Sequence, residues 1–120
     1  MTTAKPEDLT QARYLVSFIS LLSSETKGYE KAAEQMMNEV VKQPGFIAVY
    51  SARDNTGVGI TNSYWSSIES ISHWKSNSKH QAVQKQGKST WYQWYQLQIC
   101  EIKRSYVGGI NASSNENGEK

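Results

Sequence analysis

The segment from residue 14 to residue 22 limits the possible folds most, because it is apolar on both sides of an extended chain. The apolar residues fall on both parities of the run: Tyr14, Val16, Phe18 and Leu22 against Leu15, Ile19 and Leu21. Successive side chains of a strand point to opposite faces of the sheet, so a strand of this kind is covered on both faces. The segment therefore predicts a central strand.

Helical spacing follows this strand. Apolar side chains recur every three or four residues, at Tyr29, Ala32, Ala33, Met36, Met37 and Val40. This spacing is typical of an amphipathic helix, and Pro44-Gly45 is expected to follow its end.

A hairpin is predicted next, from two β-rich runs at 46–53 and 58–65. Between them stands Asp54-Asn55-Thr56-Gly57, which supplies turn-forming residues and a glycine able to take positive φ. A strand, then a helix, then a β-hairpin is a common unit of α+β folds.

A second helix is predicted after the hairpin, in two pieces. Ser66 and Glu69 have capping-box spacing, and Asn77-Ser78 can break the helix and cap it again. The second piece is expected to close at Gly87 in a left-handed conformation. The last strand is predicted over 95–107, with a bulge near Cys100 and with the Cys100 thiol buried.

The order of these elements predicts an α+β fold of the ferredoxin-like βαββαβ kind, a four-stranded antiparallel sheet with helices on one face. The other face needs cover, and a second copy packed sheet to sheet is the simplest cover for so short a chain. The chain is therefore expected to be a homodimer that forms a dimeric α/β barrel. We expect residues 1–12 to be flexible, residues 13–107 to form the domain, and residues 108–120 to be a disordered tail.

Charge and composition argue against several classes of protein. The net charge is only +2 and the longest basic run is Lys103-Arg104, so no nucleic acid partner is expected. No run of about 18 apolar residues is present, so no membrane-spanning segment is expected. The single cysteine fits a reducing compartment, and we expect a cytoplasmic protein.

The chain resembles the antibiotic biosynthesis monooxygenase family, of the dimeric α+β barrel superfamily. The resemblance covers about residues 13–107. It is carried by Tyr64-Trp65, Trp74-Lys75, His80, Gln84, Gly87, Trp91-Tyr92, Tyr95 and Arg104-Ser105-Tyr106, after the Pro44-Gly45-Phe46 strand start. The family includes enzymes that oxidise phenolic compounds without a cofactor.

The resemblance implies a cofactor-independent monooxygenase that oxidises a small aromatic or quinol-like compound, with no cofactor and no metal. Polar groups would stabilise the substrate anion, and His80 is the preferred base because imidazole titrates near neutral pH. His80 and Asn62 are the expected catalytic residues. The expected substrate-binding residues are Tyr64, Trp65, Trp74, Trp91 and Tyr92.

Two alternatives remain open at this point. Haem-degrading relatives have a histidine ligand ten residues after a tryptophan like Trp74, but Gln84 stands there in this chain. An amide is a poor replacement for imidazole on iron, so haem degradation is disfavoured. The other alternative is a non-catalytic dimer that binds a ligand or serves in a stress response.

Overall fold

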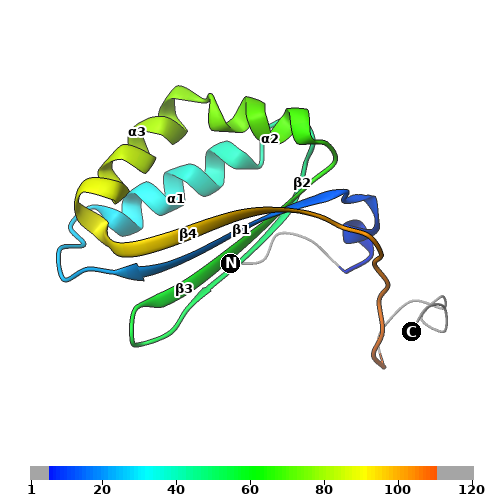
Figure 1. Ribbon diagram of the computed structural model, residues 1–120, viewed down its shortest axis with the longest axis horizontal. Helices are drawn as coiled ribbons and strands as arrows, with labels where there is room; N and C mark the ends of the chain where they lie inside the picture. Colours follow the sequence, from blue (N-terminus) through cyan, green and yellow to red (C-terminus); the bar gives the residue numbers. More distant parts are fainter. Residues whose placement is uncertain (1–5, 111–120) are drawn as a thin grey trace.

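An antiparallel sheet with helices along one side forms the part of the chain that the computed structural model describes, residues 6–110 (Figure 1). Its strands are β1 (Tyr14–Leu22), β2 (Phe46–Arg53), β3 (Val58–Trp65) and β4 (Tyr92–Glu101). They lie in the order β2-β3-β1-β4, so β1 is central. This arrangement confirms the predicted ferredoxin-like α+β fold.

The helices lie together on one side of this sheet (Figure 1). They are α1 (Tyr29–Val40), α2 (Ile68–Lys75) and α3 (Ser78–Gln86). A π-helical turn, Gly87–Trp91, joins α3 to β4, and a 3-10 helix, Pro6–Gln11, precedes β1. Asn77 caps α3 by accepting a hydrogen bond from the His80 amide at 3.0 Å, as the sequence predicts. None of the described helices is long and apolar enough to span a membrane.

Trp65 is the centre of the hydrophobic core. Its side chain is fully buried at the end of β3 and clusters with Val40 of α1 and Ile71 of α2. Half-buried apolar side chains surround this cluster, namely Tyr14, Val16, Met37, Phe46 and Trp74. Replacing a buried Trp by Ala typically lowers the free energy of unfolding by about 3–5 kcal/mol.

Strand register assigns the sheet residues to two faces. Tyr14 pairs with Trp65 and Ser20 pairs with Gly59, and side chains of paired residues point the same way. Because Tyr14 and Trp65 contact the helices, this side is called the covered face. The opposite side, called the open face, carries the alternate residues, among them Leu15, Ser17, Ile19, Ile60, Asn62 and Tyr64.

Two predicted helix ends differ from the structure. The cap of α2 is Ser67, which accepts from the Ser70 amide at 3.1 Å, and not Ser66 with Glu69. Gly87 is not left-handed, because its φ is −60° and the chain continues into the π-helical turn. The missing side chain at Gly87 instead makes room for the Tyr92 ring, which a Cβ there would approach to 2.7 Å.

The last strand also differs from its prediction. β4 starts earlier and ends at Glu101, and it pairs with β1 without a shift at Cys100. The register shift lies instead between Leu21 and Leu22 of β1. Cys100 points to the open face opposite Leu15 and is exposed, so the prediction of a buried thiol is wrong for the single chain.

Beyond β4 the chain forms an extended arm that leaves the sheet (Figure 1). Tyr106 on this arm is about half exposed and Ile110 is fully exposed. The predicted tail, 108–120, lies mostly outside the described residues, as does the start of the predicted N-terminal segment, 1–12.

Candidate functional site

Trp74 and His80 form a stacked pair above the covered face. Their ring centroids lie 4.3 Å apart with planes 16° from parallel. Trp74 lies in the last turn of α2 and packs against the core, and His80 lies in the first turn of α3. Because the helix breaks at Asn77, one ring folds back over the other. The sequence argument named both residues, and the structure brings them together.

The contacts of His80 select one tautomer. Its Nδ1 lies 3.2 Å from the backbone carbonyl oxygen of Trp74. A carbonyl only accepts, so Nδ1 of the neutral ring carries the hydrogen and Nε2 keeps its lone pair. Burial lowers the pKa of His80 below its usual value, against a smaller opposite effect of the Trp74 carbonyl. His80 is therefore a neutral ring at pH 7 with one nitrogen able to take a proton.

Aromatic side chains from α1, the π-helical turn and β4 pack into a second group on the same face. Tyr29 meets Trp91 and Tyr92 edge to face, at centroid distances of 5.6 and 5.9 Å. The ring centroid of Phe18, on β1, lies 5.4 Å from that of Tyr92 and 5.7 Å from that of Tyr95. Trp91 is buried, and its indole nitrogen donates to the Lys27 carbonyl at 2.9 Å.

Tyr92 is held in its neutral form by this environment. Burial raises the pKa of Tyr92 far above its usual value, and the neighbouring Tyr29 raises the pKa further, while Arg53 has a smaller opposite effect. A phenol that does not ionise offers its hydroxyl as a hydrogen-bond donor at any physiological pH. The Tyr92 hydroxyl is hydrogen-bonded to that of Tyr29, so Tyr92 is a neutral structural partner of Tyr29 and not a base.

Arg53, at the end of β2, is a polar residue of the covered face that the sequence argument missed. Its guanidinium group donates to the Ser20 hydroxyl at 2.9 Å, to the Tyr29 hydroxyl at 3.0 Å and to the Gly57 carbonyl at 2.6 Å. The alternation within β2 was the available signal, because in the hairpin register Arg53 pairs with Gly59 on the side of Trp65.

Asn62 and Tyr64 lie on the open face, across the sheet from His80. Asn62 pairs with Ser17 and with Tyr50, and its Oδ1 is buried without a hydrogen-bond partner in the described chain. The structure therefore does not bring the two expected catalytic residues together. On the covered face the neighbouring position holds Thr61, whose hydroxyl lies 2.8 Å from that of Ser51.

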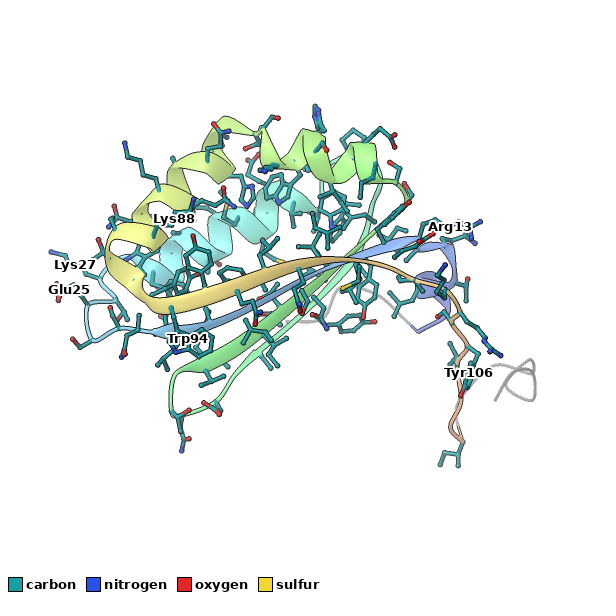
Figure 2. All side chains as sticks on the ribbon, viewed as in Figure 1. Arg13, Glu25, Lys27, Lys88, Trp94 and Tyr106 are labelled. Atoms are coloured by element: carbon teal, nitrogen blue, oxygen red, sulfur yellow. The ribbon has the colours of Figure 1, made fainter. Side chains whose placement is uncertain are left out.

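Two surface hollows lie away from these groups. One, of about 480 Å³, is lined by Gln84 and by other polar residues of α3 and the π-helical turn, including Lys88. Figure 2 shows Lys88 on that turn, on the helix side of the sheet. The other, of about 520 Å³, lies between Arg13, Ser67 and Ile102. Within residues 6–110 no three His, Cys, Asp or Glu side chains form a group that could hold a metal.

The fold and the aromatic covered face define a small α+β domain of the kind found in dimeric barrel proteins. A sequence model of the antibiotic biosynthesis monooxygenase family matches residues 14–86. The uncharacterized protein YqjZ of Bacillus subtilis is 41% identical over 91 residues, which are 76% of this chain and 80% of YqjZ. The chain belongs to the antibiotic biosynthesis monooxygenase family.

Solved structures share the same fold at low sequence identity. SnoaB, a cofactor-independent oxygenase from Streptomyces nogalater, superposes with a TM-score of 0.67 at 7% identity, over 78% of this chain and 96% of SnoaB. A conserved protein from Methanosarcina mazei gives 0.70 at 11% identity, over 79% of this chain and 97% of that protein. Identities this low relate the folds and assign no reaction.

Proposed function

We propose that the chain is a cofactor-independent monooxygenase that oxidises a small phenolic or quinol-like compound. The observation that carries this proposal is the His80 ring, which keeps an unprotonated Nε2 at neutral pH beside the indole of Trp74. Membership of the monooxygenase family and the fold shared with SnoaB support the same reaction class.

The reaction needs no external reductant. Nε2 of His80 takes the phenolic proton, and the resulting anion gives electrons to dioxygen while a new carbon–oxygen bond forms. One oxygen atom enters the ring as a carbonyl, and the other leaves as water with two hydrogens of the substrate. A phenol and dioxygen thus yield a quinone and water. Hydrogen bonds to the developing anion lower the barrier.

We propose that the active form is a homodimer in which two open faces meet. The helices α1, α2 and α3 lie on the other side of the sheet (Figure 1), and on the open face Ile60 and Trp94 are 45% and 46% exposed. Figure 2 shows Trp94 on the side of the sheet away from the helices. The arm with Tyr106 extends beyond the sheet and is free to reach a partner.

A second function, a binding domain without catalysis, is favoured by one specific observation. The amide of Asn62, expected to stabilise a substrate anion, lies across the sheet from His80. Among the described residues, the hydrogen-bond partner of the His80 ring is the Trp74 carbonyl. A ring so placed could line a ligand site without doing chemistry.

Oxygen uptake separates the two functions. The purified protein is mixed with naphthol and with naphthoquinol, and dioxygen is followed with an electrode against a protein-free control. The oxygenase proposal expects uptake with at least one phenol and a loss of about a hundredfold or more in His80→Gln, since general bases contribute that much. Binding of these compounds with no uptake above the control would favour the silent binding domain.

A further inference from the structure

We propose that the arm that follows β4, residues 102–110, binds as an added strand along the free edge of β4 in a second copy of the chain. Each covered face is then walled by both copies, because β4 forms one border of that face. The inference rests on the proposed homodimer and adds the place at which one copy completes the site of the other. It concerns backbone pairing and can be tested without turnover.

The first step is that β4 is an edge strand. Among the described residues it lies at the end of the strand order and pairs with β1 alone. Residues 92–100 carry no charge and no proline, which are the residue types that usually protect a free edge. The other edge strand, β2, is less open, because it contacts the 3-10 helix Pro6–Gln11 and buries Ala48 and Val49. The edge of β4 is therefore open to pairing with another chain segment.

The second step is that apolar side chains of β4 are exposed although they lie on the covered face. Leu97 pairs with Phe18 and Ile99 pairs with Val16, so both point to the helix side of the sheet. They are nevertheless 45% and 51% exposed. Val16 packs on the core cluster that Trp74 also contacts, so this exposed row borders the candidate site. A strand added beside β4 would cover the row through cross-strand contacts.

The third step is that the arm does not reach this edge in its own chain. The Ile102 amide donates to the Arg13 carbonyl at 2.9 Å, and beyond this bond the arm continues away from the sheet (Figure 1). Residues 102–107 contain no glycine or proline and take no positive φ, and they do not turn back toward β4. Figure 2 shows Tyr106 on the arm, beyond the end of the sheet. The β4 edge that the arm can reach is therefore that of another copy.

The fourth step is that the arm is long enough to do so. Residues 102–110 extend over about 30 Å, at a rise of about 3.3 Å per residue. Sheets packed face to face lie about 10 Å apart, so about three residues are enough to cross from one sheet to the other. About six residues then remain to pair along β4 of the second copy, which is an ordinary strand length. A dimer of two open faces therefore brings this edge within reach of the arm.

The opposing arrangement joins β4 of one copy to β4 of the other in one continuous sheet. It would leave the arm without a strand beside it and would leave Ile60 and Trp94 of the open face uncovered. Exchange of the arms gives both the edge and the arm a partner while the two open faces stay together. The two arrangements differ in whether the amides of the arm are protected from solvent.

The experiment is amide hydrogen exchange of the full chain, with mass spectrometry of peptides from 92–101 and 102–110. Proline tests the pairing because it removes a backbone donor. Successive amides of a strand point to opposite sides, so only one of Ser105→Pro and Tyr106→Pro removes a pairing amide. In that variant both peptides should exchange at least about tenfold faster than in the alanine variant at the same position, Ser105→Ala or Tyr106→Ala. The other proline faces solvent and should match its alanine control.

Several results would overturn the inference. These are fast exchange of 102–110 in the wild-type dimer, slow exchange of the arm that persists after dilution to monomers, equal rates in the proline and alanine variants at both positions, or a wild type that is a monomer at all concentrations. Slow exchange of 92–101 with fast exchange of the arm would indicate pairing of β4 with β4 instead. If a proline variant does not fold, the wild-type exchange of the arm still decides.

The inference and the oxygenase proposal fail separately. Oxygen uptake by a protein whose arm exchanges fast would remove the exchange of arms and leave the oxygenase standing. A protected arm without oxygen uptake with any phenol would do the reverse.

Discussion

The imidazole of His80 stacks on the indole of Trp74 at 4.3 Å, and its Nδ1 is bound to the carbonyl of the same tryptophan at 3.2 Å. One residue therefore sets both the orientation and the tautomer of the other. The pair comes from two short helices separated by the Asn77 cap, so the helix break has a structural consequence for the site. Removing the break would carry the His80 ring around the helix and away from Trp74.

The pH dependence of stability should report the burial of His80. Burial lowers the pKa of folded His80, whereas in the unfolded chain it takes a proton near pH 6.5. Above this pH both states are neutral and His80 contributes nothing. As the pH falls, the unfolded state binds the proton first, so the folded state loses stability until folded His80 is protonated in turn.

The measurement is urea unfolding of the wild type and of His80→Gln at pH 7.5 and pH 5. The wild type should lose more free energy of unfolding over this interval than His80→Gln, in which this group cannot titrate. His73→Gln, at an exposed histidine on α2, is the matched control and should behave like the wild type. An equal loss in wild type and His80→Gln would show that His80 titrates alike in the two states.

The core position of Trp65 predicts a large stability effect. Trp65 is fully buried, and its indole nitrogen donates to the Ser63 hydroxyl at 2.9 Å. Trp65→Ala should lower the free energy of unfolding by about 3–5 kcal/mol, because it leaves a large cavity. Trp94→Ala, at an exposed position, should cost much less in the monomer. Chemical denaturation of both variants measures the difference, and similar losses would contradict the placement of Trp65.

The proposed dimer predicts a difference between two exposed isoleucines. Ile60 lies on the open face and is 45% exposed, whereas Ile68 on α2 is 40% exposed on the helix side. Ile60→Lys should raise the dissociation constant of the dimer by tenfold or more, since it buries a charge at the interface. Ile68→Lys should leave it unchanged. Sedimentation equilibrium measures both, and a wild-type mass of one chain at all concentrations would remove the dimer.

Gly59 gives a way to move Arg53 without removing its charge. A Cβ at residue 59 overlaps the guanidinium carbon, and the flexible arginine side chain is the part that would yield. Gly59→Ala should therefore displace Arg53 from its hydrogen-bond acceptors on Ser20, Gly57 and Tyr29 and lower the free energy of unfolding, while the net charge is unchanged. Gly57 is not a suitable control, since its φ is +97°. Urea unfolding measures the change, and a Gly59→Ala protein as stable as the wild type would mean that the present position of Arg53 is not needed.

The sequence was most informative where local chemistry decides the structure. The hairpin has its predicted bounds because Asp54 accepts from the amides of Thr56 and Val58, at 2.9 and 3.2 Å, while Gly57 takes a positive φ. The helix of residues 29–40 also follows from its own apolar spacing. Both depend on residues close together in the chain.

The site was less predictable because it depends on which face each strand residue joins. Asn62 was expected beside His80, but strand alternation from Trp65 places it on the other face. The same alternation would have placed Thr61 and Arg53 on the covered face, the side on which His80 lies. The partners of Arg53 lie up to 33 residues away in the chain, at Ser20, and a single sequence gives no signal for such pairings.

The most direct test of the central claim is oxidation of a phenol under isotopically labelled dioxygen, with mass spectrometry of the product. The account predicts a quinone that carries one labelled oxygen atom, formed by the wild type without added cofactor and lost in His80→Gln. Unlabelled product, or labelled product formed equally by His80→Gln and in the absence of protein, would contradict it.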